Sequence, residues 1–575
     1  MTKTRAGAPP PVLPQTTREP RSHAIEINPG FRRALDIMEG TDRHVFITGK
    51  AGTGKSTLLE LWRSQTLKRI AVLAPTGVAA LNVRGQTVHS FFGFKPDITP
   101  DAVRKLSRAK TKGAAPDRAS IYRNLDAIVI DEVSMVRADL MDCVEKFLRL
   151  NGPRPKEFFG GVQMIFIGDL YQLPPVVTSR EKGLFAADPS PFFRNASGPR
   201  GTSSAAPLAA TPARYESPYF FSAKIFGELT FDMEFVELEK VYRQTDAAFI
   251  DLLNAIRNRS VDDGQIIHLN SRLQPSFSPP DTEFYITLTS TNDLAAVRNR
   301  EMLASLPGRT RRYEGFIQGE FDRSSLPTDE ALELKPGAQV MLLTNDRKGR
   351  WVNGTIGRVA RIVKVADDDD IICVDLPDGE RVDLSPNTWD LFRFRYEAES
   401  DRIESESVGS FTQYPLRLAW AVTIHKSQGK TYDRVVIDIG RGAFAHGQVY
   451  VALSRCTSFE GIVLKTPIRK GHIWMDWRIV RFLTRFQYKK AEEALPAADK
   501  RALVLGAIRA GRELEIVYLK PDDTKSRRRI RPEAVEMMEY HGRTFEGVRA
   551  YCHKRGECRT FRLDRMLEVS EIDKR

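Results

Sequence analysis

Cysteine is scarce in this sequence, with five residues in 575, at positions 143, 373, 456, 552 and 558. No two of them form a C-x-x-C pair, so neither a zinc ribbon nor a disulfide framework is predicted, and a reducing compartment suits the chain. Long apolar runs are missing as well, which argues against a membrane span. We therefore expect a cytoplasmic protein that does not enter a membrane.

The first 24 residues lack the features of a secretory signal, because prolines interrupt the stretch that would have to be apolar. The absence of acidic residues before Glu19 is shared with transit peptides, but the same prolines argue against an amphipathic helix. We interpret residues 1–24 as a disordered tail.

What the chain does have is an ordinary globular composition, with 41% hydrophobic and 28% charged residues. Its length exceeds what one hydrophobic core supports, so three or more domains are expected. The 87 Lys and Arg against 74 Asp and Glu give a net charge of +13. This balance suits a polyanionic partner, although proteins without such a partner share it.

Two sets of short β-branched runs alternate with helical stretches, which predicts an α/β fold class with two parallel sheets in tandem. The first set is HVFIT, IAVLA, LDAIVI and QMIFIG, and the second is FYITLTS, RVVIDIG and GIVLK. We expect the first domain to span residues 25–225 and the second to span residues 226–331 and 411–490.

Three other segments differ from these domains in composition and sequence pattern. Residues 332–410 hold short strands broken by Gly, Asp and Pro, which predicts a small β-barrel inserted in the second domain. Residues 184–217 are rich in Ala, Ser, Pro and Gly and are expected to form a flexible insertion. A last block with its own strands predicts a mainly-β domain at residues 495–575.

The string GKAGTGKST fits G-x-x-x-x-G-K-[ST], with a predicted strand before it and a predicted helix after it. Such a loop turns backbone N–H groups toward phosphates at a helix N-terminus; an incidental glycine turn is the alternative. Lys55 would reach the β- and γ-phosphates of ATP, and Ser56 would hold Mg²⁺. The predicted ATP-binding residues are Gly49, Ala51, Gly52, Thr53, Gly54, Lys55, Ser56 and Thr57.

Carboxylates follow the predicted strand LDAIVI, at Asp131 and Glu132, where ligands bind in open α/β sheets. Asp131 would join the Mg²⁺ shell and Glu132 would orient or deprotonate the attacking water, unless the two acids only cap a helix. After the fourth strand, the amide of Gln172 could touch both the γ-phosphate and the water. Asp169 and Gln172 could instead be turn residues fixed by the following prolines.

Four further strings appear in order: APTGVAALNVRGQTVHSFFGF at 74–94, VYRQTD at 241–246, LAWAVTIHKSQGKTYD at 418–433 and YVALSRC at 450–456. With the P-loop, DEVSM and GDLYQLPPV they make seven motifs that resemble superfamily-one DNA helicases of the Pif (petite integration frequency) family and its RecD-like relatives. The resemblance covers roughly residues 27–470. It implies two tandem RecA-like domains, an SH3-like inserted barrel and a bacterial, nucleoid-associated protein that is monomeric when free.

The resemblance also implies roles for individual residues. Arg243 and Arg455 match the two arginine fingers of the family, although either could be a surface ion pair. The implied catalytic residues are Lys55, Asp131, Glu132, Gln172, Arg243 and Arg455. The implied DNA-binding residues are Pro75, Thr76, His89, Phe91, Phe92, Thr423, His425, Lys426 and Gln428. Phe91 and Phe92 could equally be residues of the hydrophobic core.

One departure concerns the nucleotide base. Family members usually carry a glutamine before the P-loop that reads adenine, whereas this chain has no Gln between residues 16 and 64 and places Arg32 or Arg33 near that point. Strict preference for ATP over GTP is therefore not predicted. The helix after DEVSM matches the eukaryotic signature only loosely, which favours a bacterial-type relative.

The C-terminal block carries 19 Lys and Arg against 13 Asp and Glu over residues 500–575. Its strings LEIVYLKPDD, RRRIRPEAV and AYCHKRGECRTFRLDRM resemble the WYL domain, with Val517 in place of the tryptophan. In such modules a groove of arginines and aromatics binds nucleic acid or a nucleotide-like ligand, unless the aromatics are core and the arginines a solvated face. The groove candidates are Tyr518, Arg531, Tyr551, Arg555, Arg559, Phe561 and Arg562.

These features together predict an ATP-dependent DNA helicase that moves 5′ to 3′ on single-stranded DNA and unwinds tailed duplexes. The expected processes are replication, repair, recombination or telomere maintenance. Two alternatives stay open: a P-loop ATPase regulated through a ligand-sensing WYL domain, and the motor subunit of a nuclease complex. No helix-turn-helix is apparent, which counts against a transcription factor.

Overall fold

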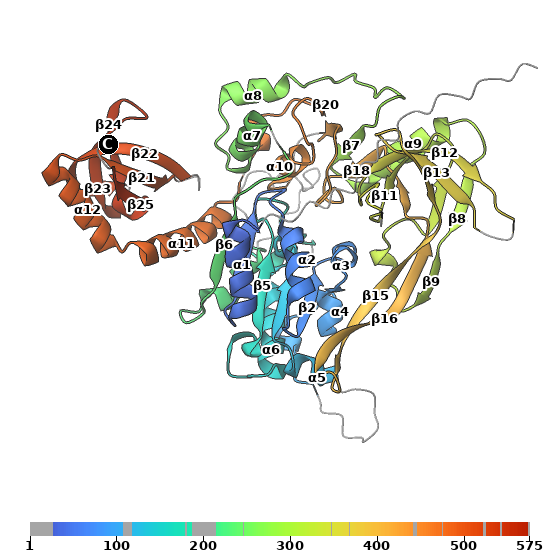
Figure 1. The fold of residues 1–575 in the computed structure, drawn as a ribbon, viewed down its shortest axis with the longest axis horizontal. Helices are drawn as coiled ribbons and strands as arrows, with labels where there is room; N and C mark the ends of the chain where they lie inside the picture. The colour runs from blue at the N-terminus through green and yellow to red at the C-terminus, as the bar shows by residue number, and fades with distance from the viewer. Residues whose placement is uncertain are drawn as a thin grey trace, which may run out of the picture.

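The computed structural model describes residues 27–572 except 107–117, 179–180, 187–213, 245, 347, 367–368, 441–444, 474, 521–524 and 541–542. The expected tail 1–24 and most of the expected insertion 184–217 lie outside the described residues. Figure 1 shows two α/β domains stacked on one another, with a β-rich region on one side and a C-terminal domain on the other. No helix within the described ranges is long and apolar enough to cross a membrane.

The first domain is built on a six-stranded parallel sheet in the order β3-β2-β4-β5-β1-β6. Its central strands are continuous apolar runs because helices cover both faces, with α1 and α2 on one face and α6 on the other. The strands are β1 (Val45–Gly49), β2 (Ile70–Ala74), β3 (Gln86–Thr87), β4 (Ala127–Ile130), β5 (Gln163–Ile167) and β6 (Glu234–Leu238). The helices are α1 (Pro29–Gly40), α2 (Lys55–Gln65), α3 (Gly77–Asn82), α4 (Val88–Phe92), α5 (Arg118–Arg123) and α6 (Ala138–Asn151).

The second domain has a four-stranded parallel sheet in the order β18-β7-β19-β20. Its hydrophobic core is continuous with the core of the first domain, so the two domains are in contact. The strands are β7 (Ile286–Thr289), β18 (Ala421–Thr423), β19 (Val435–Asp438) and β20 (Ile462–Leu464). The helices are α7 (Ala247–Arg257), α8 (Asp263–Asn270), α9 (Asn292–Ser305) and α10 (Gln448–Leu453).

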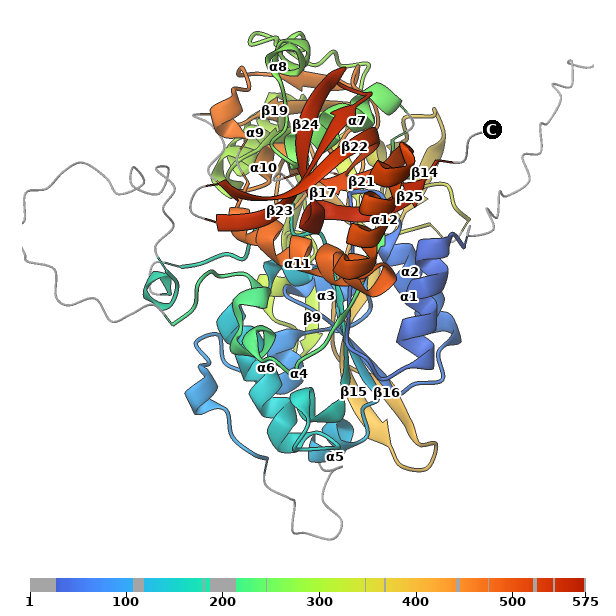
Figure 2. The ribbon, with the colours of Figure 1, turned by 90° about the vertical axis from the view of Figure 1, so that its left-hand side faces the viewer.

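The inserted region is antiparallel and larger than the barrel expected from the sequence. A five-stranded sheet in the order β14-β13-β12-β11-β17 is joined by the pair β10-β8 and by the sheet β15-β16-β9. Both views show the long β15–β16 ribbon running down to α5 of the first domain (Figures 1 and 2). The strands are β8 (Arg311–Glu314), β9 (Phe316–Gly319), β10 (Ala331–Leu334), β11 (Gln339–Leu342), β12 (Ile356–Val363), β13 (Ile371–Asp375), β14 (Arg381–Leu384), β15 (Asn387–Glu397), β16 (Arg402–Gln413) and β17 (Leu416–Leu418).

Two helices, α11 (Trp477–Ala494) and α12 (Ala497–Ala510), connect the two α/β domains to the C-terminal sheet. The rings of Phe482 and Phe486 on α11 stack on Phe221 and Phe235 of the first domain, at 4.4 and 5.2 Å. The C-terminal sheet is antiparallel in the order β24-β23-β22-β21-β25, which confirms a mainly-β domain. Its strands are β21 (Leu514–Leu519), β22 (Lys525–Tyr540), β23 (Arg543–Cys552), β24 (Glu557–Arg562) and β25 (Met566–Glu571).

Two expected boundaries are wrong. The first domain continues past residue 225, because β6 pairs along its length with β1 and completes the first sheet. The insertion begins before residue 332, because β8 and β9 pair with β10 and β16 rather than with the second sheet. Neither pairing can be deduced from the strand pattern alone, since strand partners are chosen by tertiary packing.

Candidate nucleotide-binding site between the two α/β domains

The loop from Gly49 to Lys55 joins β1 to α2 and has the geometry of a phosphate cradle. Gly52 and Gly54 have φ of 80° and 83°, a left-handed conformation that glycine adopts without strain. Helix α2 begins with no side-chain cap on its first N–H groups, which leaves them available to an anion. The Nζ of Lys55 donates to the carbonyls of Gly49 and Lys50 at 2.7 and 3.1 Å, inside the loop. Burial lowers the pKa of Lys55.

The two predicted carboxylates lie next to this loop, at the end of β4. Burial, followed by the charge of Glu132, raises the pKa of Asp131 to about 7, and burial raises the pKa of Glu132. Glu132 has φ of 51°, an unusual conformation for a residue with a side chain. Asp131 is buried and Glu132 half-buried, and neither has an ion pair in the described residues, so together they offer oxygen donors that suit a cation.

The loop after β5 brings a further polar group to the same place. Gln172 is buried, and its Nε2 donates to Asp169 at 3.3 Å. The carboxylate of Asp169 pairs with the guanidinium of Arg257, on α7 of the second domain, at 3.3 Å. The guanidinium carbon of Arg257 also lies 3.8 Å from the ring centroid of Tyr171. A buried ion pair between Arg257 and Asp169 therefore links the second domain to this loop.

Arg243 and Arg455 both lie at the domain boundary beside the P-loop. The Cα of Gly52 faces Arg243 so closely that an added Cβ would lie 2.5 Å from the Cβ of Arg243. Arg243 donates to the carbonyls of Gly429 and Ser454, and Arg455 to those of Ser427 and Lys430. Burial lowers the pKa of Arg243 to about 9 and also lowers that of Arg455.

No carboxylate of the described chain pairs with either arginine within 4.0 Å. Arg455 is thus a buried positive charge, and Arg243 a half-buried one, that no carboxylate of the described residues contacts directly. Such an arrangement is costly unless an anionic ligand completes it. The surface ion pair considered as an alternative for these arginines is wrong.

Three residues that the sequence reasoning did not single out also belong to this site. The backbone N–H of Ala51 donates to the hydroxyl of Tyr450 at 3.1 Å, across the domain boundary. Gln244 ties the two arginine segments together by donating to the carbonyls of Ser454 and Cys456. Arg257 is the third. Tyr450 and Gln244 stand inside the strings YVALSRC and VYRQTD, whereas Arg257 carries no motif signal.

The residues predicted to bind DNA in the first domain divide into two groups. Pro75, Thr76 and His89 are half-buried or exposed at the starts of α3 and α4. Phe91 and Phe92 are only 4% and 3% exposed, in an aromatic cluster with Tyr122 and Phe147. The prediction that these two rings stack on DNA bases is therefore wrong, because both rings pack against other aromatic side chains of the core.

In the second domain, the predicted DNA segment approaches the nucleotide site. Thr423 is buried and accepts from the backbone N–H of Lys426, whose side chain is exposed. Gln428 donates to the side-chain oxygen of Gln172 at 3.5 Å. One end of this segment thus contacts the loop that faces the carboxylates.

The residues predicted to form a WYL groove differ in their burial. Phe561 is 5% exposed and belongs to the core of the C-terminal domain, with Tyr518 packed against it. The prediction that Phe561 lines a ligand groove is wrong, because its ring is buried in this core, whereas Tyr518 is half-buried and its role stays a prediction. Arg531, Arg555 and Arg559 are exposed, and Arg531 lies over the half-buried ring of Tyr551 at 5.6 Å. Arg562 pairs with Asp564 at 2.6 Å.

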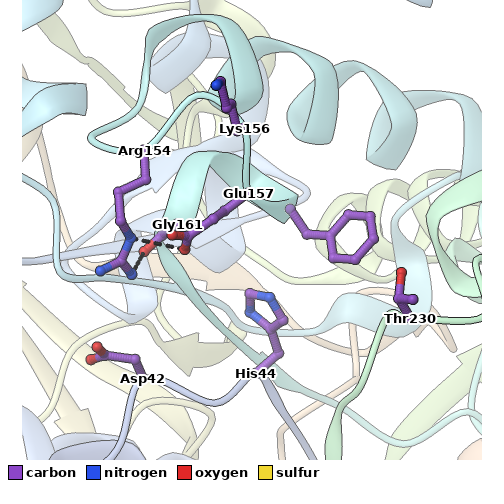
Figure 3. Close-up of a pocket in the computed structure, with 8 residues that line it drawn as sticks. Asp42, His44, Arg154, Lys156, Glu157, Gly161 and Thr230 are labelled. Atoms are coloured by element: carbon purple, nitrogen blue, oxygen red, sulfur yellow. Dashed lines mark hydrogen bonds and ion pairs between the residues drawn. The ribbon is translucent and has the colours of Figure 1, made fainter.

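A surface pocket of about 490 Å³ lies at the opposite end of the first sheet (Figure 3). His44, just before β1, contributes to its wall, and burial lowers the pKa of His44 to about 4. The guanidinium of Arg154 forms an ion pair with Glu157 at 2.8 Å and donates a hydrogen bond to the carbonyl of Gly161 at 2.7 Å. None of the predicted site residues lines this pocket, so it is separate from the nucleotide site.

The chain is similar to known proteins over most of its length. A family model described as PIF1-like helicase matches residues 31–189, and one described as WYL domain matches residues 500–571. A structure of Bacteroides sp. Pif1 with ADP-AlF4 is 31% identical, with a TM-score of 0.66, over 81% of this chain and 98% of that one. The chain belongs to the PIF1-like helicase family. This confirms the resemblance, the two RecA-like domains and the C-terminal WYL domain.

Two curated relatives show the range of the family. The ATP-dependent DNA helicase PIF1 of Homo sapiens is 33% identical over 73% of this chain and 57% of its own length. The ATP-dependent DNA helicase Pif1 of Bdellovibrio bacteriovorus is 28% identical over 81% of this chain and 93% of its own length. This PIF1-like chain thus matches little more than half of the human protein and nearly all of the bacterial one.

Proposed function

We propose that this PIF1-like protein is an ATP-dependent DNA helicase. The single observation that carries the proposal is the pair of arginines at the domain boundary, buried Arg455 and half-buried Arg243, neither of which has a carboxylate within 4.0 Å in the described residues. A triphosphate bound at Gly49–Thr57 would supply the missing negative charge and hold the domains together. Hydrolysis would remove part of that charge and loosen the contact, which is what a motor requires.

Mg²⁺ fits the oxygen donors that this site presents. The hydroxyl of Ser56 and the carboxylate of Asp131 are the protein groups that would hold it, with the remaining ligands from phosphate and water. The ion would supply charge neutralisation on the phosphates. Glu132 would orient and deprotonate the attacking water, and Gln172 would contact both the water and the γ-phosphate.

Single-stranded DNA is the proposed track. The Pif1 helicase of Bacteroides, whose chain is 32% identical to this one, has been crystallised bound to ssDNA. In this chain the contact from Gln428 to Gln172 supports the same use, because it links the segment 423–428 to the hydrolysis site. The direction 5′ to 3′ and the roles in replication, repair or recombination are adopted from the family.

The test is hydrolysis and unwinding by the full chain on a panel of DNA substrates. We expect single-stranded DNA to raise ATP turnover at least about tenfold, and a duplex with a 5′ tail to be unwound while a 3′-tailed duplex is not. Blunt duplex is the control. Turnover that ignores single-stranded DNA would refute the proposal, and preference for the 3′ tail would refute the direction alone.

The WYL domain is proposed to add a nucleic-acid contact. Arg531 supports this, because its exposed guanidinium lies over Tyr551 and offers both charge and a stacking face. We expect Arg531→Ala to weaken single-stranded DNA binding about fivefold and to lower its salt dependence. Arg527→Ala is the matched control, because Arg527 on the same strand pairs with Glu515. Equal affinities of both variants and the parent chain would contradict the contact.

A further inference from the structure

The loop after β5, residues 168–173, belongs to the first domain by sequence, yet a side chain of the second domain holds it. Arg257, the last residue of α7, pairs with Asp169 at 3.3 Å, and its guanidinium carbon lies 3.8 Å from the ring centroid of Tyr171. Arg257, Asp169 and Tyr171 are 7%, 0% and 1% exposed. Solvent therefore screens this ion pair little, so the attraction between the two charges is strong.

A second segment of the second domain contacts the same loop. His446 is 2% exposed, and its Nδ1 accepts a hydrogen bond from the backbone N–H of Asp476 at 3.2 Å. The Nε2 of His446 is then the nitrogen that donates to the carbonyl of Leu170, at 3.2 Å. Gly447 packs so closely that an added Cβ would lie 2.3 Å from the carbonyl oxygen of Tyr171. The loop is thus in direct contact with the second domain at several points.

The contact made by Arg257 reaches the predicted γ-phosphate contact through one residue. Asp169 meets Arg257 through its Oδ1, and through its Oδ2 it accepts a hydrogen bond from the Nε2 of Gln172 at 3.3 Å. The side-chain oxygen of Gln172 accepts from Gln428 of the second domain at 3.5 Å. Both ends of the Gln172 carboxamide are therefore oriented by groups that the second domain holds or supplies.

A movement of the second domain acts on this chain of contacts. If the second domain moved without the loop, it would leave the charges of Arg257 and Asp169 buried without partners, which is unfavourable. We therefore expect the loop to follow the second domain and to carry Gln172 with it. The Nε of Arg257 is buried and lacks a hydrogen-bond partner in the described residues, so this arginine is not optimised for stability alone.

We propose that Arg257 is a positioning residue for ATP hydrolysis, because it holds Asp169 from the second domain and thereby sets where the carboxamide of Gln172 stands relative to the γ-phosphate. Arg257 acts through Asp169 and Gln172 rather than on the nucleotide itself. The loop after β5 in this way transmits the position of the second domain to the first-domain half of the site. This inference rests on the proposed nucleotide site and on the proposed role of Gln172.

The first test is Arg257→Met, which keeps a long side chain and removes its charge. We expect kcat with single-stranded DNA to fall about thirtyfold, while the equilibrium affinity for ATP stays within about threefold of the parent chain. Arg257→Lys keeps the charge, and we expect it to restore turnover to within about fivefold of the parent chain. An unchanged kcat in Arg257→Met, or an equal loss of affinity and turnover, would overturn the positioning role.

Arg350→Met is the matched control for this substitution. It also breaks an ion pair between an arginine and an aspartate, that with Asp346 at 2.9 Å, but in the insertion. We expect its kcat to equal that of the parent chain. A thirtyfold loss in this control as well would show that kcat responds to any broken ion pair, and would overturn the specific role of Arg257.

A double-mutant cycle with Gln172→Ala separates positioning from a general loss of structure. If Arg257 acts through Gln172, adding Arg257→Met to Gln172→Ala costs no further turnover. A merely structural role predicts instead that the two losses multiply, and that result would overturn the inference. If Arg257→Met does not fold, as judged by thermal unfolding, the same cycle is completed with Arg257→Lys, which retains the buried charge.

This proposal and the helicase proposal fail in distinguishable ways. If single-stranded DNA does not stimulate hydrolysis, the helicase proposal fails, whereas the cycle measured on DNA-independent hydrolysis still decides the role of Arg257. If hydrolysis is stimulated but the two losses multiply, only the positioning role fails.

Discussion

Lys55→Ala is expected to reduce ATP turnover by about 10³-fold or more, to the background of the assay. The ammonium group of Lys55 donates to the carbonyls of Gly49 and Lys50, so it lies inside the loop that would surround the phosphates. Removing it leaves the charge that develops on the γ-phosphate without its nearest cation. The measurement is steady-state phosphate release with saturating single-stranded DNA.

Lys156→Ala is the matched control for this substitution. It removes the same charge at the other end of the sheet, beside the pocket of Figure 3. We expect its turnover to equal that of the parent chain. Turnover of the Lys55→Ala protein within about tenfold of the control would contradict the assignment of Gly49–Thr57 as the fuel site.

Arg455→Ala is expected to leave nucleotide binding within about threefold of the parent chain and to reduce turnover by about 10³-fold. The physical reason is that Arg455 contributes a charge from the second domain, which acts on the transition state more than on the bound ground state. Nucleotide affinity is measured by equilibrium titration, and turnover by phosphate release. Normal turnover would contradict the arginine-finger role.

Loss of structure is the competing explanation, because Arg455 also donates to the carbonyls of Val451, Ser427 and Lys430. Arg455→Lys keeps the charge but loses the guanidinium fork, and we expect it to fold normally and still turn over slowly. Arg272→Ala is a further control, since Arg272 likewise donates to two carbonyls of the second domain, those of Ile462 and Glu460, outside the site. We expect its turnover to be unchanged.

The local parts of the site could be predicted from the sequence because their geometry depends on few neighbours. The glycines of the P-loop require φ values that the structure shows, and the strand before them and the helix after them follow from short-range pattern. The position of Asp131 at the end of a buried strand follows from the same pattern. In each case the evidence lies within about ten residues of the chain.

The predictions that failed depended on which surfaces meet. Phe91 and Phe92 looked available for bases, but the ring of Phe147 on α6 and that of Tyr122 on α5 enclose them. Phe561 was predicted to contact a ligand, but its side chain lies in the hydrophobic core of the C-terminal domain. An aromatic side chain has the same sequence signature in a core and in a binding groove, so burial alone separates the two.

The sequence by itself determined the family, the phosphate-binding loop, the carboxylates and the two arginines, because each is a short motif whose chemistry needs those residue types at that spacing. Only the tertiary structure decided that Arg455 is buried and Arg243 half-buried with no carboxylate within 4.0 Å of either guanidinium in the described residues, and that Arg257 pairs with Asp169 across the domain boundary. The reason is physical: motifs specify local backbone and chemistry, whereas burial and charge pairing arise from segments that are hundreds of residues apart and meet only when the chain is folded.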